Sequence, residues 1–114
     1  MGLAEKHCAP QEGGTPPLTE TEENRYNKIV GWEIDRTGVH KIRRVFTFIS
    51  FVESIAFVNK VAAIAEEEQH HPEIHVSFRK VIIELHTHSV LGLSENDFIL
   101  AAKIDKIINR GDLG

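Results

Sequence analysis

The segment 80–88 alternates between aliphatic and polar side chains, and no other feature of the chain constrains the fold more strongly. Successive side chains of a β-strand point to opposite faces of the sheet. The two alternating sets are Val81, Ile83 and Leu85 on one face and Ile82, Glu84, His86 and His88 on the other. Such a strand is typical of an antiparallel sheet that is covered on one side only. We therefore expect the aliphatic set to face covering helices and both histidines to face away from the core.

Three other segments have the features of helices, and we expect them at 19–30, 51–69 and 95–110. Each begins beside a residue that can cap a helix, namely Thr19 or Thr21, then Ser50, then Ser94. Gly31 and Gly111 are suitable stops for the first and third helices. Apolar residues cover about half the circumference of the second helix, which is wider than packing on one sheet requires. That helix is either deeply buried or also in contact with a partner subunit, and both interpretations stay open.

Strands are expected at 32–35, 40–48 and 73–78 in addition to 80–88. The pair Arg43-Arg44 shifts the alternation of the second strand, which indicates either a bulge or an exposed stretch. The expected order is helix, two strands, helix, two strands, helix. This order predicts an α+β domain with helices on one face of an antiparallel sheet.

Residues 1–17 contain Gly13-Gly14 and Pro16-Pro17 and few apolar side chains, so we predict a disordered tail before a domain at 18–114. Cys8 lies in this tail and is expected to be an exposed, unused thiol. It is the single cysteine of the chain, which excludes an intrachain disulfide.

The chain has 114 residues and a formal net charge of -4, with a pI of about 5.9. This charge argues against nucleic-acid binding, which needs clustered Lys and Arg for phosphate contacts. No apolar run approaches the ~18 residues of a membrane span. We expect a cytoplasmic protein without nucleic-acid or membrane partners, and an organelle after removal of a targeting segment stays open.

Five of the seven histidines fall between His70 and His88. His86 and His88 share the polar face of their strand, and His70-His71-Pro72 lies at the entry to the neighbouring strand. Two imidazoles beside a substrate can supply one proton donor and one proton acceptor near neutral pH. Three alternatives stay open: the histidines form such an acid–base site, they are solvated surface, or His86 and His88 bind zinc together with a third histidine. Against zinc, no His-x-x-x-His pair lies in a segment expected to be helical, and no cysteine is nearby.

The spaced residues Glu66-x3-His70-His71-Pro72-x5-Phe78-x9-His88-x8-Asp97 resemble the signature of the pterin-4a-carbinolamine dehydratases. The resemblance extends through Gly31-Trp32 and the run 92–97, so that it covers roughly residues 18 to 110. It implies a four-stranded antiparallel sheet with three helices on one face, and assembly into homodimers or homotetramers.

The resemblance also implies an activity, the dehydration of 4a-hydroxytetrahydrobiopterin to quinonoid dihydrobiopterin in tetrahydrobiopterin recycling. It implies neither metal nor cofactor, a pterin as the substrate, and an aromatic amino-acid hydroxylase as an optional partner. A non-catalytic dimerisation or assembly module of the same fold is the alternative. Retention of all three motif histidines favours the enzyme.

The residue roles that follow from the resemblance form two groups. The catalytic group is His70 and His88 as an acid–base pair and His71 as the residue that positions the substrate. The expected substrate-binding group is Gln69, Pro72, His86, Thr87, Ser89 and Asp97. Asp97 is expected to orient the His88 side, and a strong alternative, a helix-capping role, does not exclude this. The sequence leaves undecided which histidine of the pair is the acid.

Overall fold

The structure is a computed structural model that describes residues 2–109. In this range, three α-helices and two short 3-10 helices accompany four strands. The helical elements are η1 (Leu3–Glu5), α1 (Glu20–Val30), α2 (Phe51–Glu68), η2 (His88–Val90) and α3 (Glu95–Asn109). The strands are β1 (Glu33–Asp35), β2 (Lys41–Thr47), β3 (Glu73–Ser77) and β4 (Lys80–Leu85).

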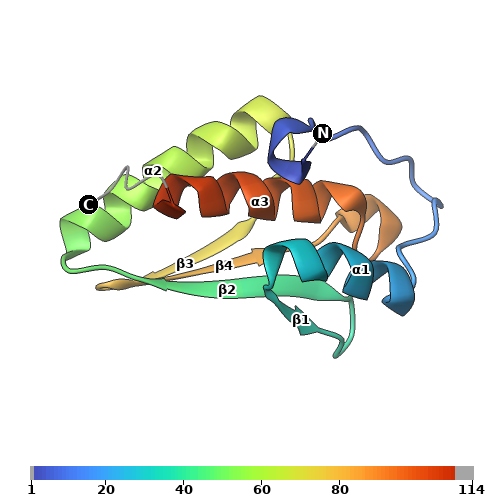
Figure 1. Cartoon of the computed structure of the whole chain (residues 1–114), viewed down its shortest axis with the longest axis horizontal. Coiled ribbons are helices and arrows are strands. Elements are labelled where there is room, and N and C mark those ends of the chain that lie inside the picture. The colour runs from blue at the N-terminus through green and yellow to red at the C-terminus, as the bar shows by residue number, and fades with distance from the viewer. Residues whose placement is uncertain (1, 110–114) are drawn as a thin grey trace.

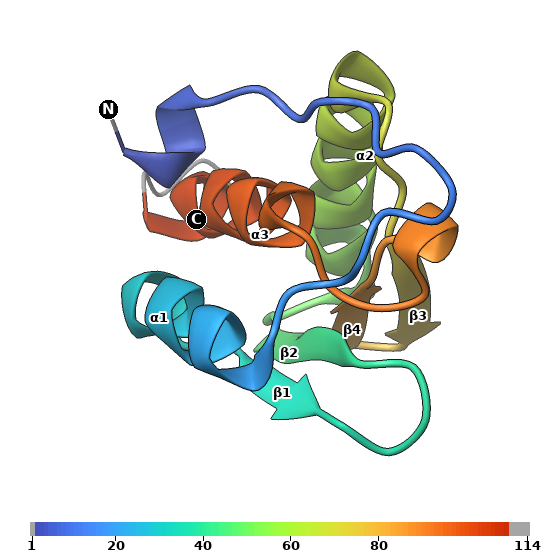
Figure 2. The same cartoon turned by 90° about the vertical axis from the view of Figure 1, so that its right-hand side faces the viewer.

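The four strands form one antiparallel sheet in the order β1-β2-β4-β3. All three α-helices lie on the same face of this sheet, and within residues 2–109 no helix covers its other face (Figures 1 and 2). The α+β fold and the element order predicted from the sequence are therefore confirmed. The expected end of the third helix at Arg110, with Gly111 as its stop, lies outside the described residues.

Helix boundaries follow the local capping signals. Thr19, rather than Thr21, caps α1, because its side chain accepts a hydrogen bond from the backbone N–H of Glu22 while the Glu22 carboxylate accepts one from Thr19. Gly31 ends α1 in the left-handed region, at φ 68°. Helix α2 ends at Gln69, which also adopts a left-handed conformation, three residues before the proline expected to close it. This early turn directs the chain toward the cavity described below.

The core lies between the sheet and the helices, as the alternation in 80–88 predicts. Val81, Ile83 and Leu85 are fully buried. They belong to one cluster with Phe57 of α2 and Ile104 of α3. Burying an aliphatic side chain of this size contributes about 1.5–3 kcal/mol to folding. The aliphatic face of β4 thus holds the helical layer against the sheet.

Strand β2 pairs with β4 in an unbroken register from Ile42 opposite Leu85 to Thr47 opposite Lys80. The bulge considered at the double arginine is therefore wrong. Arg44 instead points toward the helices, where its guanidinium lies 4.6 Å from the Phe46 ring and 2.5 Å from Asp105 of α3. A charged side chain is tolerated there because a carboxylate partner and an aromatic face replace part of its hydration.

The predicted disordered tail differs from the structure, in which residues 2–17 lie against the domain. Figures 1 and 2 show this segment running from η1 beside α3, past the C-terminal end of α2, and then down to the start of α1. Leu3 is only 6% exposed and joins the core, and Cys8 is half-buried rather than exposed. The physical reason is that one apolar anchor and several hydrogen bonds offset the entropy of ordering this segment.

Over residues 2–109, none of the helices combines the length and the apolar character that crossing a membrane would require.

Candidate active site

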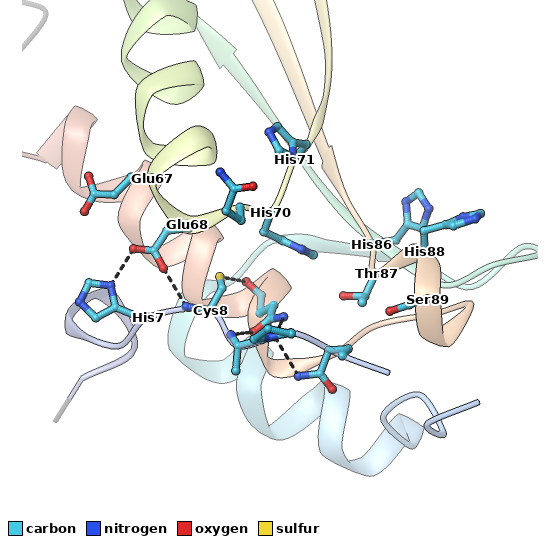
Figure 3. A pocket seen from close by; sticks show the side chains of 15 residues that line it. His7, Cys8, Glu67, Glu68, His70, His71, His86, Thr87, His88 and Ser89 are labelled. Carbon is cyan, nitrogen blue, oxygen red and sulfur yellow. Dashed lines mark hydrogen bonds and ion pairs between the residues drawn. The ribbon is translucent and has the colours of Figure 1, made fainter. Parts of the chain in front are cut away.

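A cavity of about 780 Å³ lies where α2 ends and where the chain leaves β4 (Figure 3). Most of the side chains predicted from the sequence as site residues line it, namely Gln69, His70, His71, His86, Thr87, His88 and Ser89. Pro72 and Asp97 are not among the lining residues. The tertiary structure therefore brings the two histidine segments of the sequence to one cavity.

His70 rests on a buried carboxylate. Its Nε2 atom lies 2.6 Å from Oδ1 of Asp97, a residue that is fully buried. The other carboxylate oxygen, Oδ2, accepts hydrogen bonds from the Thr87 hydroxyl at 2.8 Å and the Ser94 backbone N–H at 2.9 Å. Asp97 therefore caps the start of α3 and also orients a histidine. The expectation that it orients His88 is not met, because the contact is with His70.

This arrangement assigns the nitrogens of the His70 ring. An ionised carboxylate can only accept hydrogen bonds, and both oxygens of Asp97 already face donors or the ring. With Asp97 ionised, Nε2 is the nitrogen that donates to it. In the neutral ring the second nitrogen, Nδ1, is left as a proton acceptor.

His71 has a different environment from its neighbour. Its Nε2 lies 2.5 Å from Oε2 of Glu66, and both side chains are more than half exposed. An ion pair in this setting is screened by solvent and contributes little to stability. His71 thus lines the cavity as a solvent-exposed side chain.

His88 reaches the cavity from η2, not from the strand expected at 80–88. Strand β4 ends at Leu85, and the Thr87 N–H donates to the Gly92 carbonyl at 2.8 Å, which closes a short loop. His88 and Ser89 on this loop are exposed, and Thr87 is buried. The alternation of the sequence gave His88 the correct outward direction, but it did not reveal the loop.

The Thr87 hydroxyl is already engaged by protein groups. It lies 2.7 Å from the Ser94 hydroxyl and donates to Asp97. Its position in this buried network supports the carboxylate that orients His70. Thr87 thus supports the site through these contacts and also lines the cavity wall.

The sequence did not reveal that the N-terminal segment, together with the residues of α2 and α3 that bind it, forms part of the cavity wall. The missed lining residues include His7, Cys8, Ala9, Pro10, Gln11, Glu68 and Asn96. Glu68 is buried and accepts from the Cys8 N–H at 2.7 Å, and its other oxygen lies 2.8 Å from Nδ1 of His7. Nothing in the local composition of the tail signals these contacts, which join residues about sixty positions apart.

Two ionisable groups near this wall have shifted pKa values. Burial, together with the nearby Glu68 carboxylate, raises the pKa of the Cys8 thiol to about 12, so that the thiol is neutral at physiological pH. Burial alone would raise the pKa of Glu68, but hydrogen bonds from Cys8 and His7 and the charge of Lys103 outweigh it. The net effect lowers the pKa of Glu68.

The zinc arrangement considered from the sequence does not form. Within residues 2–109, two groups of three His, Cys or acidic side chains have their ligand atoms within 4.8 Å of one another. These groups are His7, Glu67 and Glu68, and Glu73, His75 and Glu84. Neither contains His86 or His88.

Comparison with known proteins decides the family. The family model for pterin 4 alpha carbinolamine dehydratase matches residues 16–107. The chain belongs to this family. A relative from Rubrobacter xylanophilus that carries the family name is 43% identical over 92% of this chain and 97% of its own. Another from Nitrosospira multiformis is 45% identical over 92% of this chain and 91% of its own.

Two solved structures of the pterin dehydratase type share the fold. One is a transcriptional coactivator/pterin dehydratase from Brucella melitensis, with a TM-score of 0.75 and 34% identity over 80% of this chain and 97% of that chain. The other is a pterin dehydratase-like protein identified as a RuBisCO assembly factor in the alpha-carboxysome. Its TM-score is 0.58, with 26% identity over 67% of this chain and 87% of that chain. Because these names include an assembly role, the activity of this pterin dehydratase family member has to be argued from its own site.

Proposed function

We propose that this protein dehydrates 4a-hydroxytetrahydrobiopterin to quinonoid dihydrobiopterin and water, as a step of tetrahydrobiopterin recycling. One observation carries the proposal: a histidine oriented by a buried carboxylate, His70 on Asp97, lines the same cavity as the exposed His88. A module that only assembles other proteins has no need of this arrangement.

The reaction needs two proton transfers and no redox step. A base removes the proton from N5 of the carbinolamine, and the electron pair of that N–H bond forms the N5–C4a double bond. The C4a–O bond breaks, and an acid protonates the departing hydroxyl, which leaves as water. One proton is taken up and one is given back, so a pair of imidazoles completes the balance.

In our proposal, His70 is the base and His88 is the acid. Asp97 accepts a hydrogen bond from the Nε2–H of His70, which leaves Nδ1 to accept the substrate proton. The buried carboxylate then stabilises the imidazolium that forms, because a nearby negative charge favours the charged ring. His88 lies exposed on η2 and can take up its proton from solvent. His71, at the cavity edge, positions the substrate.

The remaining expected contacts fit this proposal to different degrees. Gln69, His86 and Ser89 line the cavity and can hydrogen-bond a pterin. Pro72 does not line it, and we propose that it acts by fixing the backbone beyond His71.

Stopped-flow absorbance of the 4a-carbinolamine tests the proposal directly. We expect the wild type to accelerate its decay and His70→Ala and His88→Ala each to lose at least ~100-fold in kcat, the usual scale for acid–base groups. His75→Ala is the matched control, because His75 lies on β3 and does not line the cavity. Full rates in both cavity variants would refute the assigned roles.

The proposed mechanism uses no metal. Metal analysis of the purified protein and assays in the presence of a chelator test this part separately. We expect full activity after chelation, and stoichiometric zinc needed for activity would overturn the mechanism.

An assembly role is the second candidate, and exposed apolar side chains favour it. Ile49, Phe51 and Val52, before and within the first turn of α2, are 80%, 50% and 76% exposed. Exposed apolar side chains grouped in this way indicate a protein contact. We propose that they contribute to a homodimer or homotetramer, which light scattering of the wild type and of Val52→Ser would test. An assembly role would survive His70→Ala, whereas the dehydratase activity would not.

A further inference from the structure

The N-terminal segment 3–11, here called the strap, is anchored along the outside of the helical layer. Leu3 is buried in the core, and the Lys103 ammonium donates to the Ala4 carbonyl at 2.8 Å. Lys6 forms a 2.8 Å ion pair with Glu95. These contacts place the beginning of the strap on α3 before it reaches the cavity.

At the cavity, two buried polar side chains hold the strap backbone. Asn96 accepts from the Ala9 N–H at 3.0 Å and donates to the Ala9 carbonyl at 2.7 Å. Glu68 accepts from the Cys8 N–H at 2.7 Å. Asn96 and Glu68 are 5% and 7% exposed, so both were withdrawn from water to make these bonds. A buried polar group costs free energy when it loses its hydrogen-bond partner, and therefore these bonds fix the position of the backbone segment.

Because the Cys8 N–H and both backbone groups of Ala9 are occupied, the strap contributes a mainly apolar surface at its centre. Cys8, Ala9 and Pro10 line the cavity together with His70 and His88. The Cys8 thiol adds no charge, since burial raises its pKa to about 12. In the view of Figure 3, His70 lies between the His7–Glu68 pair and the segment that carries His88. The cavity therefore combines titratable imidazoles with a small, neutral wall, which suits a flat heterocyclic ring.

We infer that the strap is part of the substrate-binding site, where Cys8, Ala9 and Pro10 pack against the pterin ring system. Asn96 and Glu68 are the positioning residues that hold the strap in place. This inference rests on the proposed function, and it adds a binding wall that the histidine motif does not contain.

Asn96→Asp tests the clamp with almost no change in shape. The aspartate places a carboxylate oxygen against the Ala9 carbonyl, so one hydrogen bond becomes a repulsion. An acidic residue is favourable in the first turn of a helix, and therefore the start of α3 is not weakened. We expect KM for the carbinolamine to rise about tenfold or more while kcat stays within about threefold. Hydrogen exchange of the Ala9 amide should become faster, which a purely remote effect would not cause.

Lys106→Ala is the control for the strap as a whole. It removes an exposed 3.3 Å ion pair with Glu5, away from the cavity, and should leave KM and kcat unchanged.

Ala9→Leu tests the wall without disturbing the clamp. Ala9 is exposed, so the larger side chain can be accommodated without a cost to the core. It should occupy space in the cavity and weaken binding of 7,8-dihydrobiopterin, a pterin without the 4a-hydroxyl, by about tenfold in Kd. Fluorescence titration measures this binding in the absence of turnover.

The outcomes separate the two proposals. Wild-type KM and Kd in both Asn96→Asp and Ala9→Leu, with an active wild type, would overturn the role of the strap and leave the dehydratase proposal standing. A wild type that neither binds the pterin nor dehydrates the carbinolamine would refute the proposed function, and the strap inference would fall with it.

Discussion

His70 Nε2 and Asp97 Oδ1 lie 2.6 Å apart although 27 positions separate the two residues in the chain. The carboxylate is fully buried and also holds Thr87 and Ser94. One side chain thus connects the end of α2, the loop after β4 and the start of α3. The same group that begins a helix also holds Nε2 of His70.

Asp97→Asn should damage both activity and stability. The amide keeps the shape of the carboxylate, but its NH2 group must face a donor, either the His70 ring or one of the groups that bind Oδ2. We expect kcat to fall about 10- to 100-fold, as for other changes of an orienting partner. The free energy of unfolding should fall by about 1–3 kcal/mol through the mismatched buried donors. Steady-state kinetics and urea denaturation measure the two effects.

Glu33→Gln is the control for this variant, because it replaces an exposed acid on β1. It should leave both quantities unchanged. An Asp97→Asn protein with normal kcat would show that the carboxylate has only a capping role.

Glu68→Gln should release the strap. The amide can still accept from Cys8, but it no longer pairs with His7, and its NH2 group lies in a partly cationic environment near Lys103. Trypsin should therefore cleave after Lys6 several-fold faster, as measured by mass spectrometry. Glu67→Gln changes the exposed neighbour and should be cleaved at the wild-type rate.

The same carboxylate makes the anchoring of the strap pH-dependent. The pKa of Glu68 is lowered in the folded protein, because hydrogen bonds and the charge of Lys103 outweigh the opposing effect of burial. Its contribution to stability is therefore present above its ordinary pKa of 4.5 and is lost as the pH falls through the lowered value. Trypsin is inactive in acid, so hydrogen exchange of the Cys8 amide is the suitable measurement. Equal protection of this amide at neutral and strongly acidic pH would contradict the prediction.

Cys8 should react slowly with alkylating reagents. Burial raises the pKa of its thiol from 9.0 to about 12, and the thiolate is the reactive form. At pH 8 we expect iodoacetamide to alkylate Cys8 in the native protein at least ~100-fold more slowly than in the protein unfolded in urea. Mass spectrometry measures the two rates. The contribution of the neutral thiol to stability is fully present below pH 9 and is lost as the pH rises from 9 toward 12. Equal rates in native and unfolded protein would indicate that this part of the strap is open in solution.

Asp105 accepts hydrogen bonds from Trp32 and Arg44, and substitutions of Asp105 test how this cluster contributes to stability. Burial raises the pKa of its carboxyl, while hydrogen bonds from Trp32 and the charge of Arg44 oppose the shift. Above the folded pKa, burial of the charged Asp105 carboxylate therefore costs free energy, and a neutral amide at this position avoids that cost. We expect Asp105→Asn to change the free energy of unfolding by less than about 1 kcal/mol, and Asp105→Ala to lower it by about 2 kcal/mol. Equal losses in urea denaturation would show that charge, rather than hydrogen bonding, holds this cluster together.

The parts of the fold that could be predicted from the sequence depend mainly on interactions between residues close together in the chain. The capping box at Thr19, the left-handed Gly31 and the alternation of Val81, Ile83 and Leu85 each act within a few residues. These signals placed the helices and strands to within about three residues at each boundary that the structure describes. The motif spacing brought His70 and His88 forward as site residues, and the fold places both at one cavity. Their catalytic roles stay predictions.

Contacts between distant residues account for what the sequence did not reveal. His40 lies 2.7 Å from Glu23, a buried carboxylate that also accepts a hydrogen bond from Arg36. Arg44 faces the helices because the register of β2 against β4 is regular. Each of these partners lies on another element, and no local pattern encodes such a pairing.

For this protein, the sequence by itself determined the element order, the buried face of the sheet and the spaced histidines, because capping and alternation depend on neighbouring residues. Only the tertiary structure decided that Asp97 orients His70 rather than His88, and that the N-terminal strap lines the cavity. Both results depend on hydrogen bonds to buried side chains far away in the chain. Such bonds become favourable only after the core has brought α2, α3 and the loop after β4 together.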